Sequence, residues 1–468
     1  MNINNFINNL KFVHKFKLDS ESILLKSKKL KFMKYYFFLL LLSISIMACS
    51  SNPENMDDTD DDIESPKETS EHPNILLVIA DDMGLDACPG YNLGSIKPNM
   101  PNLQNLMNSG IKFNNLWSNP TCTPTRASII TGKYGLRTSV LAVDDPLSTS
   151  ETSLKKYLDL NTNNEYANAV IGKWHLSRDT DHPNDMGVDY FAGFTGGGVP
   201  SYTNWTLNVN GSTSASTDYT TTKFTDLAIN WVDQQSKPWF LWLAYNAPHT
   251  PFHLPPNNLH AQGALPSDNA SINTNPLPYY MAAIEALDTE MGRLINSLSD
   301  AERENTIIIF IGDNGTPEKV AQAYSSRRAK GSIYQGGVNV PMVISGKHVT
   351  RVNASEDALI NTTDLYATIA DIAGTETTEI NDSKSFKGLL SDSDGGKRDY
   401  AYTENDDYTI RNTTHKYIYF NDGSEALYNL SDNPLENPNL LNANQLPLSS
   451  EKALIKDELT AKLLEIRN

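Results

Sequence analysis

Short, wholly apolar segments alternate with amphipathic ones over most of this chain. The segment 75–80 (ILLVIA) contains no polar residue, which is typical of a strand buried on both faces of a parallel sheet. Further buried strands are predicted at 169–171, 239–244, 307–311 and 342–344. Helices are predicted from Pro101 to a stop at Gly110, over 224–232, near 278–298 and near 363–373. This alternation predicts an α/β fold with a mostly parallel central sheet flanked by helices.

The pattern changes near residue 395, where tyrosines alternate with polar residues. Alternation of this kind predicts short antiparallel strands, and the tyrosines concerned are Tyr400, Tyr402, Tyr408, Tyr417 and Tyr419. A helix is predicted from Glu451 to about Ile466. We therefore expect a catalytic domain over 73–394 and a smaller C-terminal α+β subdomain over 395–468 that contains a short antiparallel sheet.

The first 72 residues have the composition of a targeting segment followed by a linker. Residues 33–48 run from a basic start through a short apolar stretch to small residues, as in a secretory signal. A membrane-spanning helix is the alternative, but the apolar run is too short for a bilayer. We expect a signal peptide over 1–48, with Met33 as an alternative start. The ending Ile46-Met47-Ala48-Cys49 resembles a bacterial lipobox, which places lipid on Cys49.

Residues 49–72 are acidic and polar, and we expect a flexible linker there. The predicted location is therefore the bacterial outer membrane, on the periplasmic or cell-surface side, with membrane contact through the lipid alone. The whole chain has a net charge of −18, and residues 1–48 hold +6 of it, which leaves −24 for residues 49–468. Such an acidic chain is a poor partner for nucleic acid, and it suits a saline or marine setting.

The chain has three cysteines, and Cys122 stands in the most informative surroundings. With Cys49 assigned to lipid, a disulfide between Cys88 and Cys122 is one interpretation. A buried free cysteine is another. The residues after Cys122 read Thr-Pro-Thr-Arg, and Pro124 and Gly132 mark the start and end of a predicted helix. Residue 122 is then expected just before a helix N-terminus, where backbone N–H groups favour an anion.

Polar residues follow four of the predicted strands. They are Asp81 and Asp82, Lys173 and His175, His249, and Asp313 and Asn314. Each of them taken alone is equally well explained as part of a turn or cap. In open parallel sheets, however, ligands bind beyond the carboxyl ends of the strands, so we expect these side chains to meet. Carboxylate and amide oxygens suit a hard cation, Ca²⁺ or Mg²⁺.

In order and spacing, these motifs resemble the type I sulfatases of the alkaline phosphatase superfamily, from about residue 73 to 439. The motifs are Asp81-Asp82, Cys122 to Arg126 (C-x-P-x-R), Gly172-Lys173-Trp174-His175, Pro248-His249, Asp313-Asn314-Gly315, and Lys330-Gly331 with Gly336-Gly337. The segments 426–430 and 433–437 resemble the LYDL…DPxE closure found near sulfatase C-termini. Two positions depart from the family pattern, Ser177 in place of Gly and Gln335 in place of Glu.

The resemblance implies a role for each motif. Cys122 is expected to be oxidised by a maturation enzyme to formylglycine, the nucleophile. Asp81, Asp82, Asp313 and Asn314 are then expected to bind one divalent cation together with residue 122; Ca²⁺ is expected first, and Mg²⁺ stays open. Arg126 and Lys173 are expected to stabilise the nucleophile and the sulfate. His249 and Lys330 are expected to contact the sulfate, with either one as general acid, and His175 to assist breakdown of a sulfo-enzyme intermediate.

The predicted activity is hydrolysis of sulfate esters on a sulfated carbohydrate, such as oligosaccharides of the marine polysaccharide ulvan. Two alternatives are a phosphodiester or phosphonate monoester hydrolase of the same superfamily and an inactive carbohydrate-binding lipoprotein. The polar stretches 178–220 and 250–277 are expected to form loops around the site. Candidate sugar contacts in them are Arg178, His182, Trp205 and His253.

Overall fold

The structure is a computed structural model that describes residues 72–396 and 398–468. The predicted signal peptide, Cys49 and nearly all of the predicted linker lie outside the described residues. The described residues all lie in one compact unit, and the boundary that we expect inside it, at residue 395, stays a prediction. Among the described residues, no helix combines the length and the apolar character that crossing a membrane requires.

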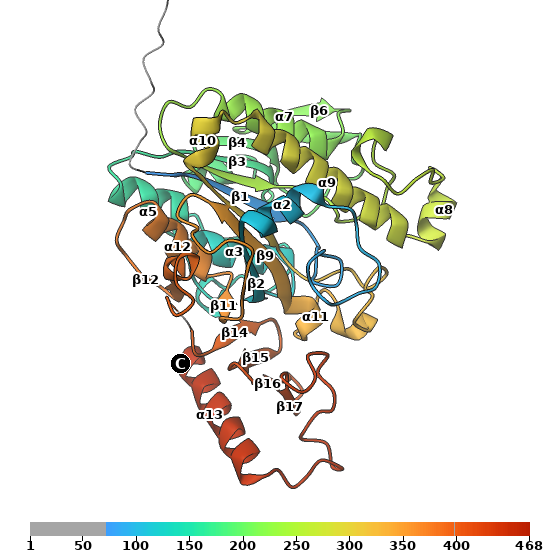
Figure 1. Cartoon of the computed structure of the whole chain (residues 1–468), viewed down its shortest axis with the longest axis vertical. Coiled ribbons are helices and arrows are strands. Elements are labelled where there is room, and N and C mark those ends of the chain that lie inside the picture. Colours follow the sequence, from blue (N-terminus) through green and yellow to red (C-terminus); the bar gives the residue numbers. More distant parts are fainter. Residues whose placement is uncertain (1–71, 397) are drawn as a thin grey trace, which may run out of the picture. The chain divides into compact units, whose positions relative to one another are not determined.

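The core of the described residues is one mixed sheet of eleven strands (Figure 1). Its order is β10-β2-β9-β8-β1-β7-β3-β4-β5-β6, with β11 paired to β2. The five strands from β8 to β4 run parallel to one another, whereas β9 is antiparallel to both of its neighbours. The strands are β1 (Asn74–Ala80), β2 (Gly110–Trp117), β3 (Ala167–Lys173), β4 (Tyr190–Phe194), β5 (Trp205–Val209), β6 (Ser212–Ser216), β7 (Trp239–Ala244), β8 (Thr306–Gly312), β9 (Asn339–Gly346), β10 (Ala354–Glu356) and β11 (Ile360–Asn361). The predicted mostly parallel α/β sheet is confirmed.

Helices cover both faces of this sheet, which is why its central strands contain so little polar sequence. On β1, Leu76 and Val78 pack into one apolar core, and Ile75 and Leu77 pack into another on the opposite face. The first core includes side chains of α2 (Pro101–Ser109), α7 (Thr220–Val232) and α9 (Leu277–Ser297). The second includes side chains of α3 (Cys122–Thr131), α5 (Leu154–Asn161) and α12 (Asp364–Ile372).

The expectation of continuous loops over 178–220 was wrong. Strands β4, β5 and β6 extend the sheet there, and β5 and β6 form an antiparallel hairpin. The turn of this hairpin is Asn210-Gly211, and both residues have positive φ, of 46° and 83°. Asn-Gly between alternating residues is a strong sequence signal for a two-residue hairpin, so the sequence does contain the evidence. The stretch 250–277 holds only a 3₁₀ helix at Asn257–Leu259 and α8 (Asn269–Thr274).

The C-terminal part forms a second, smaller sheet, as predicted. Its strands β14 to β17 pair antiparallel in sequence order, and they are β14 (Ala401–Glu404), β15 (Tyr408–Arg411), β16 (His415–Tyr419) and β17 (Glu425–Asn429). Helix α13 (Ser450–Arg467) packs against it through Leu459 and Leu463. The remaining elements are α4 (Gly135–Thr138), α6 (His182–Asp185), α10 (Asp300–Glu304), α11 (Gln335–Val338), β12 (Glu379–Ile380), β13 (Ser383–Lys384) and the 3₁₀ helices Ser326–Arg328 and Lys387–Leu390.

Candidate active site

Four neighbouring parallel strands, β8, β1, β7 and β3, end at one edge of the sheet and deliver the predicted residues there. Asp81 and Asp82 follow β1, and Asp313 and Asn314 follow β8, its neighbour. The backbone N–H of Asp313 donates to the carbonyl of Ala80 over 3.2 Å, which locks the two strand ends together. His249 follows β7, while Lys173 ends β3 with His175 two residues later.

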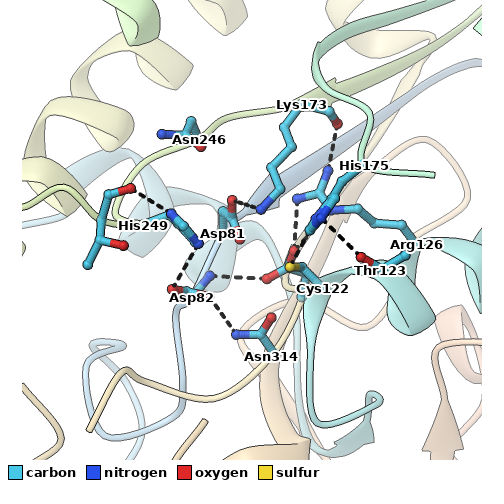
Figure 2. A network of polar contacts seen from close by, with 12 residues as sticks. Asp81, Asp82, Cys122, Thr123, Arg126, Lys173, His175, Asn246, His249 and Asn314 are labelled. Atoms are coloured by element: carbon cyan, nitrogen blue, oxygen red, sulfur yellow. Dashed lines mark hydrogen bonds and ion pairs between the residues drawn. The ribbon is translucent and has the colours of Figure 1, made fainter. Parts of the chain in front are cut away.

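Helix α3 brings Cys122 into this group (Figure 2). We expected residue 122 just before the helix, and it is the first helical residue, after Thr121 at the cap position. Its Sγ atom lies 3.2 Å from Nδ1 of His175. Both Cys88 and Cys122 are free and buried, so the disulfide interpretation is excluded. Burial raises the pKa of the Cys122 thiol above its ordinary value, which disfavours a thiolate as the reacting group.

Buried ion pairs connect two basic residues to the carboxylates. Lys173 Nζ lies 2.6 Å from Asp81 Oδ2, and Arg126 Nη2 lies 2.8 Å from Asp313 Oδ2, with all four side chains fully buried. Arg126 also donates to the carbonyl of Lys173 over 2.6 Å. Burial opposes ionisation of Asp81, but the positive charges around it, Lys173 first, hold its pKa well below the usual range. The pairs therefore keep the carboxylate of Asp81 charged in an interior position.

The residues present fit a divalent cation. Oδ1 of Asp81 and Oδ1 of Asn314 are buried without a hydrogen-bond partner, and a buried oxygen acceptor without a donor is costly unless a ligand satisfies it. Ligand atoms of Asp81, Asp82 and His249 lie within 4.8 Å of one another. Asp313 lies next to Asp82, because its two oxygens accept from Asp82 N–H and from Arg126. The donor set thus suits a hard cation, with His249 as a candidate ligand that we had not predicted.

His175 is held by a carboxylate that sequence patterns did not reveal, that of Asp144. Nε2 of His175 lies 3.0 Å from Asp144 Oδ1. Because a carboxylate can only accept, Nε2 carries the proton, and in the neutral ring Nδ1 presents its lone pair to Cys122. Burial, followed by Lys173 and Arg126, lowers the pKa of His175 to about 3. A neutral imidazole therefore faces residue 122.

Three non-glycine residues of this site have a positive φ. Asp82, Asp144 and His175 have φ values of 71°, 69° and 58°, in the left-handed region that residues with a Cβ atom seldom adopt. Such conformations persist only where surrounding contacts impose them, and they cluster at functional sites. Asp144 has no motif of its own, so its position beside His175 could not be inferred from the sequence.

Only the outer side of the site reaches solvent. The side chains of Lys330 and His249 are 22% and 18% exposed, and they lie 2.5 Å and 3.8 Å from carboxylate oxygens of Asp82. The glycine run 196–198 adjoins this side. A Cβ atom on Gly197 would lie 2.7 Å from Nε2 of His175, and one on Gly198 would lie 3.3 Å from Cε1 of His249. These glycines leave room for both histidine rings.

Asn246, which follows β7, is a further residue of the site that no sequence motif indicated. Its side chain is buried, and its two amide atoms form no hydrogen bond. Figure 2 draws it among the labelled residues of the site. Its carbonyl accepts from the hydroxyl of Tyr202 over 2.9 Å, and the same hydroxyl donates to the carbonyl of His249. Tyr202 therefore fixes the backbone path between β7 and His249.

Of the four predicted sugar contacts, only Arg178 is well exposed, at 75% of its side chain, and it pairs with Asp144. His182 and Trp205 are buried, and their ring nitrogens bond to protein groups. The structure therefore does not support contact between these two and a sugar; Trp205 faces the core because it lies on β5. His253 stacks on Tyr202, with ring centroids 3.6 Å apart. It supports the wall that carries His249.

Comparison with known proteins agrees with this geometry. The family model described as "Sulfatase" matches residues 73–375. The Escherichia coli protein named "Uncharacterized sulfatase YdeN" is 28% identical over 372 residues, which span 65% of this chain and 63% of that protein. The match thus spans less than two thirds of that relative's length. A Formosa agariphila protein named "Sulfatase" is 24% identical over 94% of this chain and 95% of its own length.

Among solved structures, the chain is similar to Ps i-CgsB, crystallised in complex with k-i-k-neocarrahexaose. The TM-score is 0.72 and the identity 26%, over 85% of this chain and 93% of that one. The family match covers well over half of the sequence and includes Asp81, Cys122, Lys173 and Asp313. The chain therefore belongs to the sulfatase family, and it is an enzyme of the sulfuric ester hydrolase class.

Proposed function

We propose that the protein removes sulfate groups from a sulfated carbohydrate by means of a formylglycine made from Cys122. The observation that carries the proposal is the position of Cys122 at the N-terminus of α3, with Sγ 3.2 Å from a neutral His175. Sγ stands where an oxygen of the converted residue would lie. A maturation enzyme that oxidises the cysteine is the partner that this proposal requires.

In the proposed mechanism, the protein's basic groups bind the sulfate and move protons. Lys330 and His249, on the exposed side, face the incoming ester, while Lys173 and Arg126 hold the carboxylates from inside. Fixed positive charges lower the free energy of the negative charge that develops on the sulfuryl oxygens. His249 or Lys330 donates a proton to the departing sugar oxygen. His175, oriented by Asp144, accepts a proton at Nδ1 from residue 122.

The converted residue and a divalent cation would supply the rest of the chemistry. The hydrate of formylglycine would supply a nucleophilic hydroxyl and a second hydroxyl through which sulfate can be expelled. A divalent cation, Ca²⁺ or alternatively Mg²⁺, would supply Lewis acidity beside residue 122. Asp81, Asp82, Asp313 and Asn314 would hold this cation together with residue 122, and His249 would join them only where Lys330 is the general acid.

The substrate that we propose is an oligosaccharide of a marine polysaccharide, and ulvan is the first candidate. The strongly acidic chain supports a saline setting, and the similar structure of Ps i-CgsB with k-i-k-neocarrahexaose supports a sulfated galactan as the second candidate. We further propose export and anchoring to the bacterial outer membrane through lipid on Cys49. Metabolic labelling with palmitate tests the anchor, because a Cys49→Ala variant should lose the label.

Two measurements test the catalytic proposal. In protein expressed with a maturation enzyme, the mass of the peptide that contains residue 122 should be that of the aldehyde form. Rates on an aryl sulfate, an aryl phosphodiester, and sulfated ulvan and carrageenan oligosaccharides should favour sulfate esters. Full activity with an unmodified Cys122 would refute the mechanism. A preference for the phosphodiester would instead support the phosphonate monoester hydrolase alternative, and inactivity of fully converted protein on every ester would favour a binding role.

A further inference from the structure

The segment 330–335 connects the active site to the C-terminal sheet. At its first residue, Lys330 Nζ lies 2.5 Å from Asp82 Oδ1. The next residue, Gly331, donates its N–H to the carbonyl of Pro120 over 2.9 Å, two residues before Cys122. The segment ends at Gln335, where α11 begins. The path of these six residues therefore sets where the ammonium group of Lys330 lies.

A buried ion pair from the C-terminal part binds the end of this segment that is farther from Lys330. Lys416, on β16, and Glu436, after β17, are both fully buried, and Nζ lies 2.6 Å from Oε1. Lys416 Nζ also donates to the carbonyl of Ile333 over 2.7 Å. Glu436 Oε2 accepts from the backbone N–H of Gln335 over 2.9 Å. Each member of the pair thus binds one backbone group of the segment, on either side of residue 334.

Stability alone is a poor explanation for this arrangement. Burying two charges carries a large desolvation cost, and well-packed apolar residues often stabilise such a position better. The segment already has an apolar attachment, because Ile333 packs in a cluster with Ile418 and Tyr428 of the C-terminal sheet. Apolar packing has little directionality, whereas a charged donor and a charged acceptor fix the position and rotation of the two peptide groups that they bind.

We propose that Lys416 and Glu436 are positioning residues for Lys330, so that the C-terminal sheet acts in catalysis through the segment 330–335. This inference rests on the proposed function, in which Lys330 contacts the sulfate. It also assigns a purpose to the glutamate of the closing C-terminal motif, Glu436, which lies in a left-handed backbone conformation with φ of 61°.

The first test is the variant Glu436→Gln. Lys416 and the N–H of Gln335 bind different oxygens of Glu436, so in the amide one of these two donors faces an NH2 group, which cannot accept. We expect kcat/KM on an aryl sulfate to fall by about tenfold to a hundredfold, the range associated with small displacements of a reacting group. Lys330 should also react faster with acetic anhydride, as measured by mass spectrometry, because its ion pair with Asp82 is loosened. Unchanged labelling and unchanged kcat/KM would overturn the proposal.

A double-mutant cycle separates positioning from a general loss of structure. In a Lys330→Ala background, Glu436→Gln should lower kcat/KM by less than about twofold, because the residue through which it acts is gone. If it lowers kcat/KM by the same factor as in the wild type, the two residues act independently and the proposal is wrong. Glu425→Gln is the matched control: Glu425, on β17 of the same sheet, pairs with Lys456 of α13, 2.9 Å apart, without touching the segment 330–335.

The double variant Lys416→Met with Glu436→Leu is a second test, for the case in which Glu436→Gln alone does not fold. It removes both charges of the pair together, although the carbonyl of Ile333 and the N–H of Gln335 lose their partners, so its unfolding temperature should fall less than that of Glu436→Gln. Its kcat/KM should still be low and its Lys330 labelling fast; wild-type values for both would contradict the inference. The labelling of Lys330 needs no substrate. If the protein hydrolyses no sulfate ester, the proposed function is refuted, and the labelling experiment still decides whether Lys416 and Glu436 position Lys330.

Discussion

At the scale of single residues, the site depends on side chains that hold other side chains. Arg126 donates hydrogen bonds to Asp313 and to the carbonyl of Lys173. Asp144 holds His175 from the side opposite Cys122. Such supporting contacts fix the geometry and the tautomer of the groups that react, and their loss is costly even though they never touch the substrate.

Replacing Asp144 tests this arrangement at His175. In Asp144→Asn, the amide can rotate to donate to Nε2, which would place the ring proton on Nδ1 and point it at residue 122. We expect kcat on an aryl sulfate to fall by about tenfold to a hundredfold, with little change in unfolding temperature because Asp144 is 41% exposed. The neighbouring Asp145→Asn, which binds only backbone N–H groups of the same loop, is the control. Full activity of Asp144→Asn would show that His175 needs no carboxylate.

At the scale of elements, helix ends and strand ends explain why the residues meet. Helix α3 points its N-terminus at the carboxyl edge of the sheet, so residue 122 lies beside the ends of β1, β3 and β8. Helix α2 lacks a cap of its own, since Met100 provides no side-chain hydrogen bond. Asp288 on α9 takes that role, and it accepts from the N–H groups of Asn102 and Leu103 over 3.0 Å and 2.8 Å.

Removing this tertiary cap should weaken the packing of α2 on α9. Asp288→Ala leaves two backbone donors without a partner in a buried position, so we expect the free energy of unfolding to fall by about 2 kcal/mol, the upper part of the range for helix caps. Urea unfolding followed by circular dichroism measures the change. Asp268→Ala removes an exposed local cap of α8 and should cost less, about 1 kcal/mol or below. Equal costs for the two variants would argue against a special role for Asp288.

At the scale of the whole molecule, one compact unit brings together residues from strands far apart in the sequence. The candidate cation ligands Asp81 and Asn314 come from β1 and β8, which are more than two hundred residues apart in the chain. A cation that binds them only in the folded state must stabilise the fold as a whole.

Removal of divalent metal should therefore lower the unfolding temperature. If Ca²⁺ is present at about a hundred times its dissociation constant, it contributes about 2.7 kcal/mol. Thermal unfolding of chelator-treated protein with and without added Ca²⁺ measures this effect, and Mg²⁺ is titrated in parallel. Asp81→Asn should abolish most of the shift, because it removes one ligand charge. A shift of the same size in this variant would mean that the cation binds elsewhere.

The sequence by itself determined much of this protein. Wholly apolar segments predicted the strands β1, β7 and β8, because a strand covered by helices on both faces excludes polar side chains. Local signals also predicted both ends of α2 and the C-terminal end of α3, since Pro and Gly act on their own backbone, whereas α3 begins at Cys122, before its predicted start. The sequence likewise placed Asp81, Lys173, His249 and Asp313 after strands, and the rule that parallel strands end at one edge brought them together.

Only the tertiary structure decided which side chains bind and orient one another. Asp144 and the pair Lys416–Glu436 stand next to their partners through folding of distant segments, and no local pattern encodes such contacts. Trp205 and His182 looked like surface residues because polar residues surround them in the sequence, yet the β5 strand and the contact with Trp174 bury them. The physical reason is that propensity and periodicity act over a few residues, whereas burial, pairing and the orientation of a proton depend on contacts across the whole fold.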